Sequence, residues 1–235
     1  MSVIAIALEE ANIPYLMYAD DLVIFHSHKD LNQASFLSNQ ALSILASNLN
    51  KLHFSVATHK CKVVIFTRKR RFVPPQFLLD GDLLPVISEI KYLGLILDSN
   101  LRWKAHLFQL TYFVYKWANL LRALTGSWWG SHPASLLQVY KSVIRAKIEY
   151  GCCFFGSAAL SHHKKLNSLQ ASCLRTALGL IKSTPIYVLN VESSCPPLPI
   201  RYHWLTGKFI LKCSSFTNSP IIDMFNMIII KWRFV

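Results

Sequence analysis

The sequence predicts an α+β fold in which an antiparallel sheet with a packed helix precedes an all-α bundle. Runs of β-branched and aromatic residues, separated by turn residues, fill the first part of the chain and are typical of β-hairpins. Apolar residues then recur every three or four positions, as in amphipathic helices. The formal charge of the 235-residue chain is +13, and its whole excess lies after Asp98. We therefore expect two parts, residues 1–98 and 99–235.

The two parts differ in the partners that suit them. Residues 1–98 hold nine Lys and Arg against nine Asp and Glu, whereas residues 99–235 hold 16 basic residues and three acids. A cationic surface attracts polyanions such as nucleic acids. With 52% hydrophobic residues, the chain is too apolar to be disordered. The second part is thus a candidate for nucleic-acid binding.

Metal-binding cysteines, secretion and membrane insertion are not predicted. The six cysteines form no C-x-x-C pair, so free thiols in the core are favoured over disulfides or zinc ligands. The apolar start of the chain ends at Glu9 and Glu10, and it is too short for a membrane span, which needs ~20 apolar residues. We expect no signal peptide or transmembrane helix, no membrane partner, and an intracellular location in the nucleus or cytoplasm.

The first predicted elements are a hairpin and a helix. Residues 13–17 and 22–25 read as two buried strands on either side of Tyr18-Ala19-Asp20-Asp21. Asp30 then predicts the start of a helix, because apolar residues follow it at helical spacing as far as Leu49.

Further strands and three helices are predicted downstream. The strands are residues 54–56 paired with 63–67, a hairpin of 77–79 with 83–86 about Asp80-Gly81-Asp82, and one strand over residues 91–97. A long apolar seam from Trp103 to Leu124 predicts the first helix, ending at Gly126. Pro133 opens a second helix that runs to Gly151, and residues 166–179 predict a third.

Asp20 and Asp21 are candidates for holding divalent cations. Asp is common in turns, so a solvated turn is the alternative interpretation. Here hydrophobic strands flank the turn on both sides and would fix the two carboxylates at a sheet edge. Carboxylate oxygens are suitable ligands for Mg²⁺. Nucleotidyl transfer uses two such ions roughly 4 Å apart, one activating the attacking hydroxyl and the other steadying the leaving pyrophosphate.

The run Tyr18-Ala19-Asp20-Asp21, followed by residues 22–25, closely resembles the catalytic hairpin of reverse transcriptases, particularly those of non-LTR (LINE-type, jockey-like) retrotransposons of insects. The resemblance implies a partial reverse-transcriptase palm followed by a thumb-like helical bundle. It also implies RNA-directed DNA polymerase ancestry, with Mg²⁺ or Mn²⁺ on Asp20 and Asp21. The implied partners are an RNA template, a DNA primer or duplex, and deoxynucleotide triphosphates.

The family's order of elements continues after the hairpin. Residues 60–69 match a lysine-bearing strand, which implies that Lys60 neutralises or protonates the departing pyrophosphate. A surface lysine beside a strand is the alternative. Residues 91–98 resemble the primer-grip strand, which implies primer contacts for Tyr92, Leu93 and Gly94. A buried strand with a bulge glycine is the alternative there. Weaker likenesses extend the match to residues 13–212.

The resemblance implies that the cationic part, residues 99–235, binds along a nucleic acid. Basic residues interleaved with aromatic ones can follow a phosphate backbone, giving salt-dependent and sequence-tolerant affinity. Taken singly, the aromatic residues are expected to pack in the core rather than stack on bases; they are Trp103, Tyr112, Tyr115 and Trp117. The candidate nucleic-acid contacts are Arg102, Lys104, Lys116, Arg122 and Arg145.

Part of the family's active site has no counterpart in these residues. A complete palm has a third metal-binding aspartate and a glycine-containing loop upstream of the hairpin, but Glu9 and Glu10 are the only acids before Tyr18. We therefore expect the 235-residue chain to be a truncated fragment that is inactive alone. The alternatives are a non-catalytic, basic nucleic-acid-binding remnant and an inert remnant that folds poorly.

Overall fold

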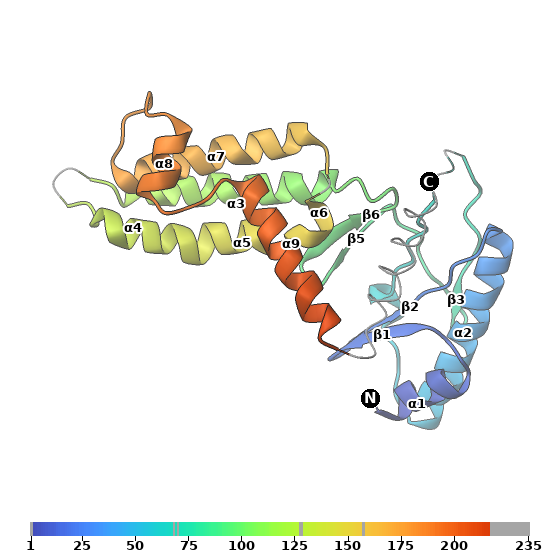
Figure 1. Cartoon of the computed structure of the whole chain (residues 1–235). Coiled ribbons are helices and arrows are strands. Elements are labelled where there is room, and N and C mark those ends of the chain that lie inside the picture. Colours follow the sequence, from blue (N-terminus) through green and yellow to red (C-terminus); the bar gives the residue numbers. More distant parts are fainter. Residues whose placement is uncertain (1, 68, 70, 127–128, 157, 217–235) are drawn as a thin grey trace. The chain divides into compact units, whose positions relative to one another are not determined.

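The computed structural model describes residues 2–67, 69, 71–126, 129–156 and 158–216 (Figure 1). Its elements are helices and small antiparallel sheets, so the predicted α+β class is confirmed. The chain divides into two compact units. The first comprises Met1–Tyr92 and Leu97–Leu101, and the second comprises Leu93–Ile96 and the residues from Arg102 onward. The predicted boundary after Asp98 lies in the stretch where the chain alternates between the units.

The first unit begins with a helix that is followed by the predicted hairpin and helix. The bounds are α1 Ser2–Glu10, β1 Tyr15–Tyr18, β2 Asp21–Ile24, α2 Leu31–Lys51, the 3₁₀ turn η1 Thr58–Lys60, β3 Leu78–Leu79, β4 Asp82–Leu83 and β5 Glu89–Tyr92. The next strand, β6 Leu95–Asp98, is divided between the two units. As predicted, Asp30 caps α2, because its side chain accepts a hydrogen bond from the Asn32 backbone N–H at 3.2 Å.

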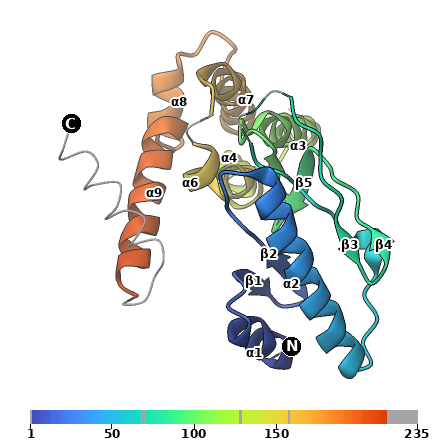
Figure 2. The ribbon, with the colours of Figure 1, turned by 90° about the vertical axis from the view of Figure 1, so that its right-hand side faces the viewer.

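One apolar cluster joins α1, α2 and the β1–β2 hairpin. Its buried members are Ile4, Leu8, Ile13, Ala41, Leu45 and Leu49. The helices α1 and α2 lie side by side in both views (Figures 1 and 2). From the hairpin, Tyr15, Leu22 and Ile24 pack against this cluster. Burial on one face of the hairpin fixes its register, because a slip by one residue would turn those side chains outward.

A second apolar cluster joins α2 to the β3–β4 hairpin. Phe77, Leu79 and Leu84 are its buried residues, and Leu42 and Ala46 of α2 pack against them. The Asn39 side chain links the same elements. It accepts a hydrogen bond from the Leu78 backbone N–H at 3.1 Å and donates one to the Gln76 carbonyl at 3.0 Å. The predicted hairpin about Asp80-Gly81 is confirmed, although its strands have two residues each.

Two strand predictions for residues 1–98 are wrong. Residues 54–56 and 63–67 do not pair, and Val63 instead forms an isolated parallel bridge with Val86. Residues 91–97 are not one strand but the end of β5, a turn at Leu93-Gly94 and most of β6. Both turn residues have positive φ, +44° and +82°. That combination is characteristic of a tight two-residue hairpin turn, and glycine adopts it without steric cost.

The second unit is helical. The bounds are α3 Lys104–Ala123, α4 Pro133–Val139, the π-helical η2 Tyr140–Arg145, α5 Ala146–Glu149, α6 Cys152–Phe155, α7 Leu160–Leu178, α8 Ile186–Glu192 and α9 Leu198–Ser214. The three predicted helices are confirmed, with Pro133 at the first position of the second. That helix contains six π-helical residues, and the third helix begins at Leu160, earlier than predicted.

The core of this unit lies between α7 and the two helical segments that it packs against, α3 and α4–α5 (Figure 1). The predicted seam of α3 is buried at Leu107, Leu110, Val114 and Leu121. Gly179 ends α7 with φ +67°, and the Leu180 N–H reaches back to the Arg175 carbonyl at 2.9 Å. This is the Schellman closure that a glycine at a helix C-terminus permits.

All six cysteines are unpaired, and Cys152, Cys173 and Cys195 are buried, as expected of core thiols. Within the described residues, every helix is too short or too polar to cross a membrane.

Candidate active site

The Asp20 and Asp21 carboxylates lie at the tip of the β1–β2 hairpin. Tyr18 pairs with Asp21 across the two strands, which leaves Ala19 and Asp20 as a two-residue connection. Ala19 has φ +54°, and a non-glycine residue in this region carries roughly 1–2 kcal/mol of strain. Packing of the strands against α1 and α2 therefore holds the turn in a conformation that the local sequence alone would not prefer.

Both carboxylates are exposed. Within the described residues, neither one accepts a side-chain hydrogen bond or pairs with a cation. Adjacent carboxylates on a fixed turn, without a competing cation, fit part of a site for Mg²⁺ or Mn²⁺. Part of such a site is all that is present, because no group of three His, Cys, Asp or Glu side chains in the described ranges is placed to hold a metal ion.

Glu9 does not join Asp20 and Asp21 as a third carboxylate of the candidate metal site. It lies on α1, where its Oε1 accepts a hydrogen bond from the Tyr15 hydroxyl at 2.8 Å. That hydrogen bond raises the pKa of Tyr15, because the neutral phenol is the donor. Glu9 thus helps to attach α1 to β1, and its carboxylate is already engaged.

Lys60 is exposed at the end of η1. The turn is linked to the β3–β4 hairpin, because the Thr58 hydroxyl donates to Asp82 Oδ2 at 2.6 Å. Downstream, the Val63 N–H donates to the Pro85 carbonyl at 3.0 Å. Among the described residues, no hydrogen bond or ion pair joins Lys60 to Asp20 or Asp21. The structure places the lysine in the same unit as the carboxylates.

The predicted primer-grip residues lie at the tip of the β5–β6 hairpin. Tyr92 ends β5, and Leu93 and Gly94 form the turn. The Leu93 carbonyl accepts a hydrogen bond from the Tyr150 hydroxyl at 2.7 Å. A Cβ on Gly94 would come within 3.3 Å of Tyr150 Cε1. The close approach that glycine allows here is thus to the Tyr150 ring, a contact that the sequence reading missed.

The basic residues predicted to contact nucleic acid lie in different environments. Arg102, Lys104, Lys116 and Arg122 are exposed. Lys116 lies 4.7 Å from the centroid of the Tyr112 ring, and Arg122 donates to Asn119 and Ser172. The expectation that single aromatics pack in the core is confirmed for Trp103, which is buried. It is wrong for Tyr112 and Tyr115, whose side chains are exposed.

Arg145 lies in the interior, with only 6% of its surface exposed. Its Nε donates to Glu149 Oε1 at 2.6 Å, and its Nη2 donates to the Pro196 carbonyl at 3.0 Å. Arg201 of α9 makes a bidentate pair with the same carboxylate, at 2.9 and 3.0 Å. The Arg145–Glu149–Arg201 triad therefore links α5 to α9, and Arg145 is directed at protein groups rather than at a surface.

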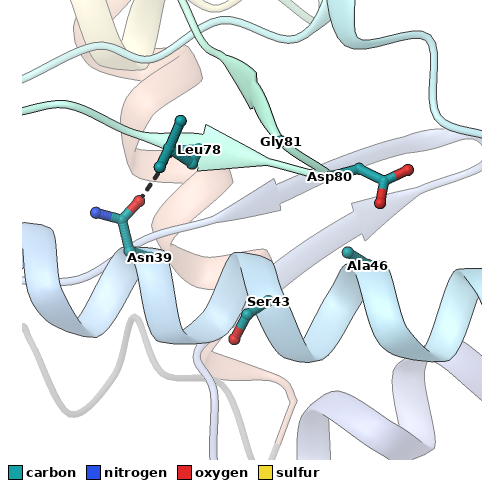
Figure 3. Close-up of a pocket in the computed structure, with 6 residues that line it drawn as sticks. All are labelled: Asn39, Ser43, Ala46, Leu78, Asp80 and Gly81. Atoms are coloured by element: carbon teal, nitrogen blue, oxygen red, sulfur yellow. Dashed lines mark hydrogen bonds between the residues drawn. The ribbon is translucent and has the colours of Figure 1, made fainter.

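A shallow hollow of about 490 Å³ lies between α2 and the β3–β4 hairpin (Figure 3). Asn39, Ser43 and Ala46 line it from the helix, and Leu78, Asp80 and Gly81 line it from the hairpin. The Asn39–Leu78 hydrogen bond spans its edge. Asp80 is the single ionisable side chain in this lining, so the hollow lacks the convergent polar groups of a binding pocket.

Sequence comparison relates the chain to polymerases of mobile elements. It is 26% identical over 216 residues to the RNA-directed DNA polymerase from mobile element jockey of Drosophila funebris, covering 90% of this chain and 23% of that protein. It is 28% identical over 172 residues to a probable RNA-directed DNA polymerase from transposon BS of Drosophila melanogaster, covering 73% and 18%. A probable RNA-directed DNA polymerase from transposon X-element is 26% identical over 170 residues.

The chain spans about a fifth of the length of the curated relatives that it matches. No protein-family model and no solved structure matches it. By sequence, then, the chain is a homologue of the jockey-like RNA-directed DNA polymerases of non-LTR retrotransposons, matching them over one segment of their length.

Proposed function

We propose that the chain supplies Asp20 and Asp21 as metal ligands for RNA-directed DNA synthesis. The observation that carries the proposal is the hairpin tip, where two exposed carboxylates stand on a turn held by packed strands. Homology to jockey-type polymerases over 90% of the chain supports it. The substrates would be deoxynucleotide triphosphates, a DNA primer and an RNA template.

The candidate residues between Asp20 and Gly94 would act mainly by positioning charge. Asp20 and Asp21 would hold Mg²⁺ or Mn²⁺, which in such sites activates the primer 3′-hydroxyl and stabilises the leaving pyrophosphate. Lys60 would neutralise or protonate that pyrophosphate, which requires a mobile cation such as an exposed lysine. Tyr92, Leu93 and Gly94 would contact the primer strand, with the turn at Leu93-Gly94 steadied by Tyr150.

The second unit would hold the nucleic acid. Arg102, Lys104, Lys116 and Arg122 are exposed, and their part of the chain carries the full excess of positive charge. Contacts of this kind act on phosphates and are largely independent of sequence. Arg145 is left out of this surface because its guanidinium is engaged by Glu149 and the Pro196 carbonyl.

We further propose that the 235-residue chain alone does not polymerise DNA. Two-metal sites need carboxylates that bridge the ions, and the described residues place no third ligand beside Asp20 and Asp21. The two carboxylates would then bind a single cation weakly in this chain, and the complete site would need a further ligand.

Metal-directed cleavage of the backbone tests where a cation binds. Fe²⁺ replaces Mg²⁺ at carboxylate sites, and with ascorbate and peroxide it generates hydroxyl radicals that cut the nearest backbone. We expect fragments ending at the Ala19-Asp20 turn, identified by mass spectrometry, that disappear in excess Mg²⁺.

The double variant Asp20→Asn, Asp21→Asn should lose this cleavage, because it removes both charges and keeps the side-chain shape. Asp30→Asn is the matched control, since asparagine caps a helix as well as aspartate does. It should leave the cleavage unchanged. Cuts that persist in the double variant, or that occur elsewhere in the wild-type chain instead, would remove the metal-site proposal.

A further inference from the structure

The helix α9 has one packed face and one exposed face. On the packed face, the centroid of the Tyr202 ring lies 5.9 Å from that of Phe155 and 5.7 Å from that of His163. The ring centroids of Phe209 and Phe154 lie 6.0 Å apart. These contacts fix α9 against α6 and α7, and Figure 1 shows the helix crossing at α6. Ile200, Trp204 and Leu211 follow each other at helical spacing on the other face, where all three are exposed.

Trp204 is held in place although 53% of its surface is exposed. The Arg201 guanidinium lies 4.5 Å from the indole centroid, and the Lys208 ammonium lies 5.3 Å from it. Arg201 cannot swing away freely, because both of its hydrogen bonds to Glu149 would break. A cation fixed by a carboxylate thus orients an exposed indole, which favours stacking with little loss of conformational entropy.

Gly207 leaves open space on the same face. It is one helical turn from Trp204, and a Cβ built on it meets no atom within 4 Å. Glycine destabilises a helix interior relative to alanine, and neither positive φ nor crowding requires it here. The packing of this chain therefore does not explain the glycine, and the gap at Gly207 would admit a flat ligand.

The charge of this face suits a polyanion. The α9 sequence contains no Asp or Glu, and Lys208 and Lys212 are exposed on it. Between residues 150 and 216, Glu192 is the only acid. An exposed aromatic ring next to cations is the arrangement by which proteins bind single strands, since each base offers a π-face and each linkage a phosphate.

We propose that the exposed face of α9 is a single-stranded nucleic-acid site, in which a base stacks on Trp204 over the gap at Gly207 and Lys208 contacts the adjoining phosphate. The site is built from residues of the second unit, shares no residue with the Asp20-Asp21 hairpin, and needs no metal. It can therefore succeed or fail independently of polymerase function, because its test measures binding without nucleotides or divalent cations.

Fluorescence anisotropy of labelled oligo(dT) and oligo(U), titrated with the full chain, tests the site. Trp204→Leu should weaken binding about tenfold, whereas Trp204→Phe should retain most of it. Gly207→Leu should weaken binding comparably by filling the gap, while Gly207→Ala stabilises the helix.

Lys208→Gln should lower the slope of log affinity against log salt by about one. Comparison of the two oligomers shows whether DNA or RNA is preferred.

Tyr187→Leu is the matched control, because it also removes an exposed aromatic ring from a helix of the second unit. It should change affinity less than twofold, and circular dichroism should show that every variant remains folded. The proposal is overturned if Trp204→Leu binds as wild type does, if Tyr187→Leu loses as much affinity, or if the wild-type chain binds neither oligomer.

Discussion

Replacing Asp20 and Asp21 with asparagine is expected to reduce template-dependent DNA synthesis at least about a thousandfold in a jockey polymerase that carries this chain in place of its matched segment. The substitution keeps the side-chain volume and hydrogen-bonding capacity at the hairpin tip. It removes two negative charges that would neutralise divalent cations, and metal stabilisation of such transition states amounts to several kcal/mol. A thousandfold corresponds to ~4 kcal/mol.

The measurement is single-turnover primer extension by the chimaera on an RNA template with Mg²⁺. The matched control is Asp30→Asn, which removes a carboxylate from the same unit while keeping the cap of α2. It should extend primers at nearly the wild-type rate. Equal extension by the chimaera with and without the two hairpin carboxylates would refute their assignment as metal ligands.

Glu149→Gln is expected to destabilise the second unit by ~3 kcal/mol, because it leaves two guanidinium groups close together without their counter-charge. Glu149 and Arg145 are largely buried, with side-chain exposures of 15% and 8%. Glutamine offers one acceptor oxygen where the carboxylate accepts from Arg145 and twice from Arg201. The loss of stability should also affect α9, since the Arg145–Glu149–Arg201 triad joins that helix to α5.

Urea unfolding followed by tryptophan fluorescence isolates this effect. All six tryptophans lie after residue 101 in the sequence, and the described ones belong to the second unit, namely Trp103, Trp117, Trp129 and Trp204. Tryptophan emission therefore follows the unfolding of that unit. Glu192→Gln makes the same chemical change at an exposed position on α8, and it should alter the free energy of unfolding by less than ~0.5 kcal/mol. Equal effects of the two substitutions would show that the triad contributes no special stability.

The contribution of Glu149 should depend on pH. Burial opposes its ionisation, but hydrogen bonds from Arg201 and Arg145 outweigh that effect and hold the pKa of the carboxyl below its ordinary value. A group with a lowered folded-state pKa stabilises fully above its unfolded-state pKa and loses that effect as the pH falls through the folded-state value. The wild-type chain should therefore lose its advantage over Glu149→Gln below about pH 4.

The sequence predicts best the elements that depend on local signals. The β1–β2 hairpin follows from two apolar runs about a short turn, α2 from the Asp30 cap, and α4 from Pro133 at its first position. Each of these signals acts within a few residues, so no distant contact is needed to interpret it.

Elements that depend on distant partners could not be predicted in the same way. Val63 pairs with Val86, and this pairing is parallel and isolated, so no hairpin signal precedes it. At Leu93-Gly94 the turn lacks the usual asparagine or aspartate before glycine, and the apolar run around it reads as one strand. The helix α9 begins at Leu198-Pro199, where prolines suggest a loop although the first turn of a helix tolerates them.

The functional residues differ in the same way, because some depend on local sequence and others on distant partners. The adjacent Asp20 and Asp21 can be recognised from the sequence alone, because the turn that exposes them is formed by neighbouring residues. The partners of Arg145, Glu149 and Arg201 lie up to about fifty residues away, so a sequence reading that counts charges assigns Arg145 to the surface. The fixed orientation of Trp204 likewise depends on Glu149 in another helix.

Primer extension by the 235-residue chain alone tests most directly the central claim, that the chain holds two carboxylates of a two-metal site without the remainder. The assay supplies a primed RNA template, all four deoxynucleotide triphosphates, and Mg²⁺ or Mn²⁺. We predict no extension above the protein-free background with either metal. Template-dependent extension that disappears in the Asp20→Ala variant would contradict the claim, because it would show that the chain completes the site by itself.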